Sequence, residues 1–283
     1  MIILAKKMFY FMYIYMEQEY DIRSVLEYYI LAGVDETAGE APFTLSSDTI
    51  KTAVAPVFVP KAKSTTISSP ARQATTELAQ ETASACKNAR EICEQAQTLE
   101  ELRQALEKFD GCSLKLTATH MVFGDGNPSA KIVLIGEAPG ADEDRCGIPF
   151  VGRSGQLLDK MMAAIGLDRS AYYITNILPW RPPGNRTPTT GEIAVCLPFL
   201  RRQLDIINPD YIVLLGGSSA NALFDNQDPI SKLRGQGLEY KKANGTIAKT
   251  LATFHPAYLL RNGGQKAKAW SDMLKLHKEI VDK

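Results

Sequence analysis

The chain has 283 residues, of which 45% are hydrophobic and 23% charged, and its formal net charge is zero. This composition is that of an ordinary globular protein, and the length allows one large domain or two small ones. Zero net charge gives no support for a nucleic-acid partner, but the charge is uneven. From Gly111 onward 21 Lys and Arg stand against 16 Asp and Glu, whereas the first 110 residues hold 11 and 16. A mildly basic C-terminal part is compatible with a nucleic-acid partner, and a solvated surface of mixed charge fits equally well.

The N-terminal segment gives no sign of membrane insertion or secretion. Its apolar run from Met8 to Met16 is nine residues long, far short of the roughly 20 that cross a bilayer. It is rich in Tyr and Phe and lacks a cleavage site, so we expect no signal peptide. We interpret residues 1–34 as an extension with a short helix over 20–33, and a weak membrane-surface contact is the alternative. The five cysteines are odd in number and widely spaced, which favours a reducing compartment over a disulfide framework.

The middle of the chain changes character twice. Residues 35–75 are rich in Ser, Thr, Ala and Pro without sustained periodicity, which predicts a disordered linker. Residues 76–110 form a helical lead-in, with helices expected over 76–96 and 99–108. We assign residues 111–283 to one main domain.

Short apolar runs alternate with helical patterns in this main domain. Runs such as KIVLI at 131–135 meet a glycine, as buried parallel strands do. One expected helix opens with Thr189 and Glu192 in capping-box spacing. The alternation predicts a mostly parallel sheet covered by helices on both faces. The expected elements are strands at 131–135, 172–177 and 211–215, a strand pair around 238–252, and helices at 153–165, 189–207, 218–224 and 264–281.

Three loops that follow strands carry polar and charged groups that sheet packing does not need. They are GEAPGADED at 136–144, NILPWRPPGNR at 176–186 and FHPAYLLR at 254–261. In parallel sheets the working loops follow the carboxyl ends of the strands, so these loops mark the candidate site. The sequence contains neither a dinucleotide fingerprint nor a phosphate-binding Gly-Lys-Ser/Thr motif.

Together with VFGDGNP at 122–128 and PFVGRSGQLLDKM at 149–161, these blocks resemble the uracil-DNA glycosylase superfamily, and most closely its family 4. The resemblance covers about Val122 to Ile280. It implies an α/β fold with three α/β/α layers around a central, mostly parallel four-stranded sheet. It also implies hydrolysis of the N-glycosidic bond of uracil in DNA, which leaves an abasic site for base excision repair, with the base flipped out of the stack.

The resemblance assigns substrate binding to Gly136, Ala138, Phe150 and Asn176. Phe150 matches the ring that stacks on the base, and Asn176 matches the amide that reads it. A carboxamide can accept from N3–H and donate to O4 of uracil, whereas cytosine presents the opposite pattern. A core Phe and a turn Asn are the structural alternatives. The better-known enzymes carry Asp where this chain has Ala138, and Gly140 offers no bulky ring against the thymine methyl.

The same resemblance assigns catalysis to Glu137, Glu143 and His255. A neutral His255 would donate toward uracil O2 as negative charge develops on the departing base. Either Glu137 or Glu143 would position the attacking water, and the choice stays open because the Asp of the better-known enzymes is missing. We expect Asp142 and Asp144 to be solvated charges at a helix end.

The partner implied is uracil-containing DNA, single- or double-stranded. The leucines of the last loop would wedge a base step, the arginines would meet phosphates, and a serine at a helix start would offer a phosphate contact or a simple N-cap. We expect a cytoplasmic monomer without membrane attachment. The residues expected to face DNA are Leu259, Leu260, Arg261, Arg181, Arg186 and Ser218.

Family 4 enzymes typically carry a [4Fe-4S] cluster on four cysteines, and here the sequence departs from the family. Cys112 and Cys196 match two of the four positions, but Phe109 and Trp180 occupy the others. Each iron needs its own protein ligand, so two thiolates cannot hold the cluster unaided. We expect no cofactor and no metal site, with Phe109 and Trp180 packed close to the two cysteines. A retained cluster is the alternative.

Two other functions stay open. One is a glycosylase-like module that binds DNA or a protein without turnover, and the other is a hydrolase of free nucleosides. Retention of Phe150, Asn176 and His255 together disfavours the first, because a pure binder needs none of them. The DNA-wedge loop disfavours the second.

Overall fold

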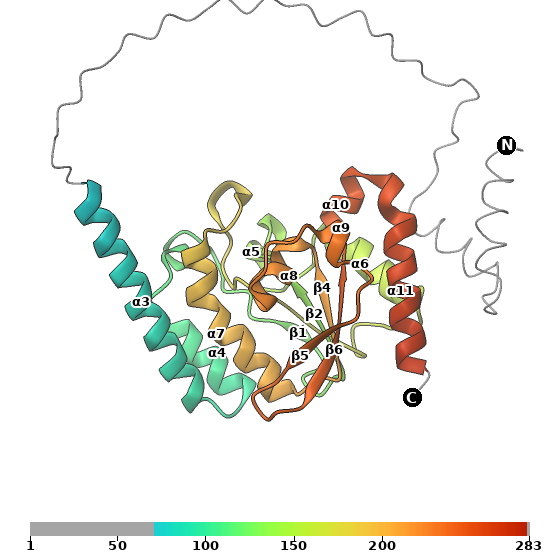
Figure 1. The fold of residues 1–283 in the computed structure, drawn as a ribbon, viewed down its shortest axis with the longest axis horizontal. Helices are drawn as coiled ribbons and strands as arrows, with labels where there is room; N and C mark the ends of the chain where they lie inside the picture. The colour runs from blue at the N-terminus through green and yellow to red at the C-terminus, as the bar shows by residue number, and fades with distance from the viewer. Residues whose placement is uncertain (1–70, 282–283) are drawn as a thin grey trace, which may run out of the picture.

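The computed structural model describes residues 71–281 (Figure 1). The helix expected at 20–33 and most of the linker expected at 35–75 lie outside the described residues. Helix α3, Ala71–Gln95, begins before the expected residue 76 and includes the end of that linker.

Within the described residues, six strands form one mixed sheet in the order β1-β3-β2-β4-β6-β5. Short antiparallel strands form its two edges, β1 at Asp125–Gly126 and β5 at Leu238–Lys241. The expected mostly parallel sheet is confirmed, but it has six strands rather than four because an edge strand pairs on each side. The four central strands are parallel: β3 (Tyr173–Asn176), β2 (Ile132–Gly136), β4 (Tyr211–Leu215) and β6 (Ile247–Thr253).

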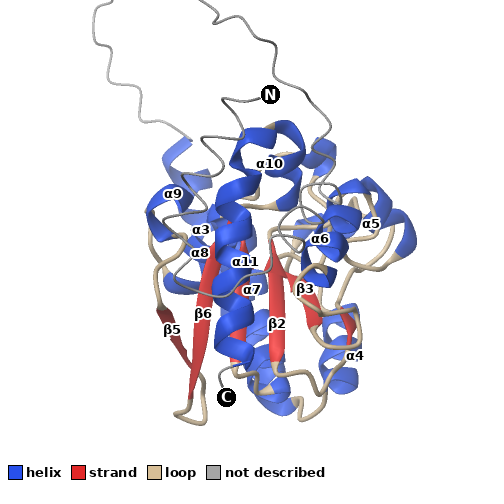
Figure 2. Cartoon of the chain, turned by 90° about the vertical axis from the view of Figure 1, so that its right-hand side faces the viewer, coloured by secondary structure: helices blue, strands red, loops and turns tan. Residues whose placement is uncertain are grey.

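Helices cover both faces of the sheet, which gives the expected three layers (Figures 1 and 2). The longer helices lie close to the predicted positions, whereas α5, α9 and α10 were not predicted as helices. One layer contains α3, α4 (Leu99–Lys108), α7 (Thr190–Ile207) and α8 (Gly217–Phe224). The other contains α6 (Arg153–Ala163), α10 (Pro256–Arg261) and α11 (Lys266–Val281). The short helices are α5 (Ala141–Cys146) and α9 (Ile230–Leu233), and single 3-10 turns are η1 (Ser113–Leu116), η2 (Pro183–Asn185) and η3 (Gly263–Gln265).

The start of α7 confirms the capping box that the sequence predicts. The Thr189 hydroxyl oxygen accepts from the backbone N–H of Glu192 at 3.2 Å, and the Glu192 carboxylate accepts from the backbone N–H of Thr189 at 2.8 Å. Two backbone donors that a helix leaves unpaired are thus satisfied locally.

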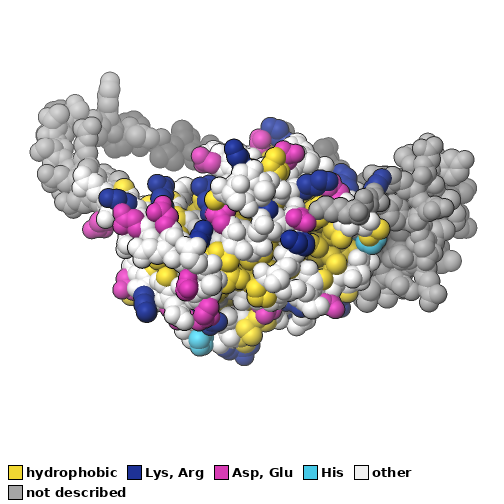
Figure 3. Space-filling model, turned by 90° about the horizontal axis from the view of Figure 1, so that it is seen from below, with side chains coloured by type: hydrophobic (Ala, Val, Ile, Leu, Met, Phe, Trp, Pro, Cys, Tyr) yellow, Lys and Arg dark blue, Asp and Glu magenta, His cyan; other side chains and the backbone are white. Residues whose placement is uncertain are grey.

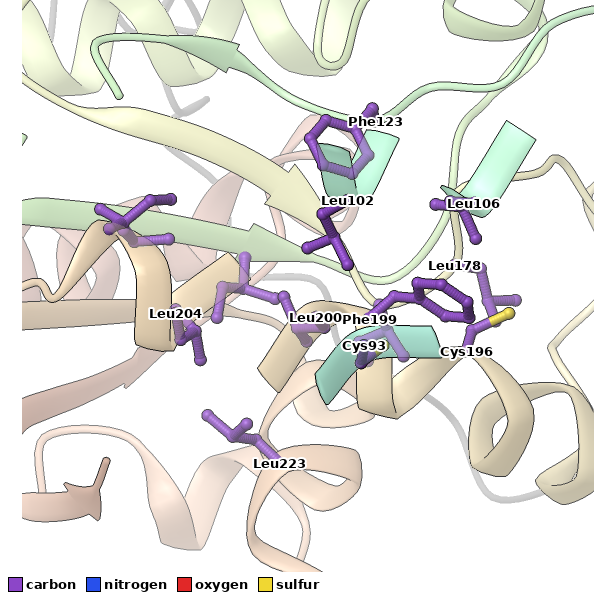
Figure 4. Close-up of a cluster of buried hydrophobic side chains, with 14 of the residues drawn as sticks. Cys93, Leu102, Leu106, Phe123, Leu178, Cys196, Phe199, Leu200, Leu204 and Leu223 are labelled. Atoms are coloured by element: carbon purple, nitrogen blue, oxygen red, sulfur yellow. The ribbon is translucent and has the colours of Figure 1, made fainter. Parts of the chain in front are cut away.

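Alternate residues of the central strands enter two hydrophobic cores. In β2, Val133 and Ile135 face the first core, and Ile132 and Leu134 face the second. Every residue of β2 is buried, as expected for a strand covered on both faces. Side chains from α3, α4 and α7 meet in the first core (Figure 4). Helices α3 and α4 are therefore part of the domain's packing and not a separate appendage.

The carboxyl ends of the parallel strands point toward α5, α6 and α10 (Figure 2). Basic and acidic side chains are interspersed on the face at the other end of the strands (Figure 3). Among residues 71–281, no helix is long and apolar enough to cross a bilayer.

Candidate active site

The carboxyl ends of three parallel strands bring the predicted loops together. Strand β2 ends at Gly136, β3 ends at Asn176, and β6 ends two residues before His255. A cavity of about 170 Å³ opens among these loops. For scale, a cavity of about 150 Å³ admits a benzene molecule, so this one can take a flat six-membered ring. Its lining includes the predicted residues Glu137, Ala138, Glu143, Phe150, Asn176, Arg186 and His255.

Residues that the sequence analysis did not single out also line the cavity. They include Pro139, Ser154, Asn185 and Ala257. Each lies inside one of the sequence blocks that carry the family resemblance, so the blocks could have pointed to them.

Asn176 presents an unpaired polar atom to this cavity. Its side chain is only 6% exposed, and its Oδ1 has no hydrogen-bond partner among the described residues. Gly136 pairs with Asn176 in the sheet. A Cβ on Gly136 would lie 2.3 Å from Oδ1 of Asn176 and 2.6 Å from Cζ of Phe150, which only glycine avoids. A buried acceptor without a donor costs about 1–3 kcal/mol, so this oxygen is suited to a ligand that donates.

Phe150 forms a wall of the cavity with His255. The two ring centroids are 5.8 Å apart and the ring planes are inclined by 31°. The Phe150 ring is buried and also belongs to the second hydrophobic core. Phe150 is thus a core residue that also lines the cavity, and its stacking role stays a prediction.

The hydrogen bonding of His255 determines its tautomer. Nδ1 accepts from the backbone N–H of Ala257 at 3.1 Å at the start of α10, so the ring proton of a neutral imidazole is on Nε2. Burial lowers the pKa of His255 to about 4, and the positive charge of Arg261 acts in the same direction. At neutral pH the ring is therefore uncharged, with its N–H on Nε2.

The two candidate acids have different surroundings. Glu143 is buried, and its two carboxylate oxygens accept from the backbone N–H groups of Gly152 at 2.9 Å and Gly140 at 3.1 Å. Glu143 thus ties two loops together. Glu137 is half-buried, and its carboxylate makes no hydrogen bond or ion pair within residues 71–281. Glu137 is the acid with free oxygens at the cavity.

The expectation of a solvated Asp144 is wrong. Its carboxylate is buried and accepts from the backbone N–H of Thr119 at 2.8 Å, from the Thr119 hydroxyl at 3.1 Å and from the backbone N–H of His120 at 3.3 Å. Asp144 therefore holds the segment at Thr119 and His120 in place. Asp142 is exposed, as expected.

The residues expected to contact DNA divide into exposed and buried groups. Leu260 is 43% exposed, and Arg261 beside it is also exposed. Leu259, in contrast, is wholly buried in the second core. Successive side chains on a helix point about 100° apart, so α10 cannot present both leucines outward, and the expected wedge role of Leu259 is corrected to a packing role.

Of the expected phosphate contacts, Arg186 lines the cavity, and both arginines have protein partners. Arg186 forms two hydrogen bonds with the Glu192 carboxylate, at 2.6 and 2.9 Å. The Nε of Arg181 donates to Oδ1 of Asn185 at 2.7 Å. Ser218 is half-buried in the first turn of α8.

The four positions of the expected cluster site lie in the first core. Phe109, Cys112, Trp180 and Cys196 are each at most 3% exposed. The thiols of Cys112 and Cys196 are hydrogen-bonded to each other; this bond lowers the pKa of Cys112 and, together with burial, raises that of Cys196. The ring centroids of Phe109 and Phe199 are 5.1 Å apart. Within residues 71–281, no group of three or more Cys, His, Asp or Glu side chains is arranged to hold a metal ion. Two thiols, with Phe109 and Trp180 at the other two positions of the same core, do not fit a four-thiolate cluster.

Comparison with known proteins agrees with this geometry. A family model described as the uracil DNA glycosylase superfamily matches residues 123–274. A Type-4 uracil-DNA glycosylase of Thermotoga maritima is 44% identical over 158 residues, which are 56% of this chain and 80% of that protein. One of Archaeoglobus fulgidus is 44% identical over 169 residues, 58% of this chain and 84% of that protein. One of Sulfurisphaera tokodaii is 40% identical over 175 residues, 60% of this chain and 79% of that protein. The match contains every residue that lines the cavity, and the chain belongs to the uracil DNA glycosylase superfamily.

Proposed function

We propose that this protein is a uracil-DNA glycosylase that hydrolyses the N-glycosidic bond of deoxyuridine in DNA and leaves an abasic site for base excision repair. The observation that carries the proposal is the buried, unpaired Oδ1 of Asn176 in a cavity of ring size. Uracil offers N3–H to this oxygen and O4 to the amide N–H, whereas cytosine presents the opposite pattern. A wrong base would leave these buried groups unpaired, which is a strong source of discrimination.

The chemistry needs a flipped base, a held water and a stabilised leaving group. The base stacks on Phe150. A water hydrogen-bonded to Glu137 attacks C1′ of the sugar, the C1′–N1 bond breaks, and its electron pair leaves with uracil as an anion. The Nε2–H of His255 donates to O2, where that negative charge collects. The carboxylate of Glu137 takes the water proton and stabilises the positive charge on the sugar.

The remaining assignments concern the DNA and the setting. Leu260 enters the base stack and Arg261 contacts the strand beside it, while Arg181 and Arg186 meet phosphates. Arg186 exchanges its pairing with Glu192 for a phosphate, and the Glu192 carboxylate keeps its hydrogen bond from the backbone N–H of Thr189. Residues 111–283 form the catalytic unit, with α3 and α4 completing its core. We assign the protein to the cytoplasm as a monomer that acts on single- or double-stranded DNA.

We also propose that the protein works without an iron–sulfur cluster. The argument is the misfit of the residues at the four positions, where two aromatic side chains take the volume of two ligands. Burial of these large side chains replaces part of the stabilisation that a cluster supplies.

The first test is base reading by Asn176. Asn176→Ala should slow excision from a uracil-containing oligonucleotide at least about tenfold, because each buried hydrogen bond lost costs about 1–3 kcal/mol. Asn176→Asp should also slow uracil excision and introduce cleavage at cytosine, since the carboxylate accepts where the amide donated. A gel assay of abasic-site formation measures both. Hydrolysis of free deoxyuridine is measured separately, because it would indicate a hydrolase of free nucleosides. Excision by Asn176→Ala at the wild-type rate would contradict the assignment, and DNA binding without any cleavage by the wild type would indicate a binding module.

The second test separates the two acids. Glu137→Gln should lower the single-turnover rate about 100-fold or more, as loss of a general base does, with little change in Tm. Glu143→Gln is the matched control and should lower Tm, because its amide nitrogen would face a backbone N–H. The opposite pattern would assign the water to Glu143.

The third test uses the titration of His255. An unfolded His has a pKa near 6.5, above the folded value of about 4. The unfolded chain therefore binds more protons between these values. The stability contributed by neutral His255 is fully present above pH 6.5 and is lost as the pH falls toward 4. His255→Leu should remove this part of the pH dependence of Tm, measured as the difference from wild type. It should also slow excision by about 100-fold, the usual effect of losing such a donor, with oligonucleotide binding retained. Loss of binding would instead indicate a structural residue.

The fourth test measures iron. Protein purified anaerobically should be colourless, without absorbance around 400 nm and without stoichiometric iron. Phe109→Ala should lower the free energy of unfolding by about 3–5 kcal/mol, the usual cost of emptying a buried aromatic site. A brown preparation with about four irons per chain would refute the cluster-free proposal.

A further inference from the structure

We propose that Arg169 is a positioning residue that holds the stacking ring of Phe150 in place by clamping its backbone carbonyl. The inference rests on the proposed function, in which Phe150 stacks on uracil. Arg169 lies outside the cavity lining, so it acts through Phe150 and not on the substrate.

The need for a clamp follows from the backbone of Phe150. Its φ is 55°, in the left-handed region that residues other than glycine rarely adopt. The surroundings must hold such a conformation, because the chain would otherwise relax out of it. Helix α6 leaves room for this conformation because it has a glycine at position 155. A Cβ on Gly155 would lie 1.8 Å from the Phe150 carbonyl oxygen. The direction of the Phe150 ring therefore depends on what fixes this carbonyl.

Arg169 provides this contact from the segment between α6 and β3. Its Nη2 donates to the Phe150 carbonyl oxygen at 2.6 Å, and its Nη1 donates to the Pro149 carbonyl oxygen at 3.3 Å. Hydrogen bonds from a charged donor are about twice as strong as neutral ones. Two successive carbonyls of the loop are thus held by one guanidinium.

The guanidinium is itself held rigidly by two carboxylates. Asp159 on α6 accepts from Nε at 2.8 Å and from Nη2 at 3.4 Å, and Asp125 of β1 accepts from Nη1 at 3.1 Å. All five N–H donors of an arginine are therefore used, and the side chain is only 28% exposed. A lysine cannot replace it, because an ammonium group has three donors and no planar fork.

A second, independent contact holds the same turn on the C-terminal side of Phe150. The Glu143 carboxylate accepts from the backbone N–H of Gly152 at 2.9 Å. The turn is thus anchored on both sides of Phe150, but within residues 71–281 Arg169 is the side chain that donates a hydrogen bond to the carbonyl of the strained residue itself. Loss of Arg169 would leave the loop attached while freeing the ring to turn away from the base.

A double-mutant cycle tests this inference. Single-turnover excision from a uracil oligonucleotide would be measured for wild type, Arg169→Lys, Phe150→Ala and the double variant, at a temperature where melting curves show all four folded. Arg169→Lys should slow excision about tenfold when Phe150 is present, and less than about twofold when residue 150 is alanine, because coupled residues lose their additivity.

The matched control is Arg202→Lys. Arg202 clamps the Ala96 carbonyl oxygen with Nε at 2.8 Å and Nη2 at 2.7 Å, between α7 and the turn after α3. This substitution removes the same type of contact far from the cavity, so its effect on excision should be small and equal in both backgrounds. If Arg169→Lys does not fold, Asp159→Asn loosens the same guanidinium, and its loss of activity should likewise disappear beside Phe150→Ala.

The outcomes separate the inference from the proposed function. Equal losses from Arg169→Lys in both backgrounds would show a general structural effect and overturn the positioning role, while uracil excision would stand. Wild-type rates for Phe150→Ala would overturn the stacking role, and the Arg169 inference with it. No excision by the wild-type protein would refute the proposed function itself.

Discussion

The site depends on the parallel pairing of β2 and β3, which sets Gly136 beside Asn176. Because Gly136 has no side chain, the Asn176 amide and the Phe150 ring both approach the end of β2. Side chains alternate between the faces of a strand, so a shift of one residue would turn Asn176 to the wrong face. The two hydrophobic cores resist such a shift, because Tyr173 would leave the first core for the second and Ile174 would leave the second for the first. The register of the sheet therefore also sets the arrangement of the cavity walls.

Around this pair, buried charged groups act as ties between loops. Glu143 joins the turns at Gly140 and Gly152, and Asp144 fixes the segment at Thr119. Each buried charge is compensated by several hydrogen bonds, as its desolvation requires. The ties hold the cavity walls before any ligand binds, which lowers the cost of ordering on binding. The same burial keeps His255 neutral, so a single environment supplies both rigidity and the protonation state that the proposed chemistry needs.

The layer that contains α3, α4 and α7 contributes hydrophobic packing. There α3 and α4 pack against α7, and Phe109 shares this core with the hydrogen-bonded thiols of Cys112 and Cys196. Large aromatic side chains bury enough apolar surface to stabilise a core by several kcal/mol. The interior thus has a dense apolar cluster at the four positions compared with the cluster ligands. The cavity at the carboxyl ends of the strands is supported by hydrophobic packing behind it.

Local sequence determined the elements of this protein. Periodicity predicted the buried strands, the spacing of Thr189 and Glu192 predicted a helix start, and the order of motifs pointed to Asn176 and the family. Periodicity and cap spacing need only neighbours along the chain, and the motif order needs only the sequence itself. Tertiary structure alone decided that Leu259 is buried, that Asp144 is a tie and that Arg169 grips the carbonyl of Phe150. The last two contacts join residues 25 and 19 positions apart, and a hydrogen bond or a buried face exists only once the folded chain has brought such groups within a few ångströms.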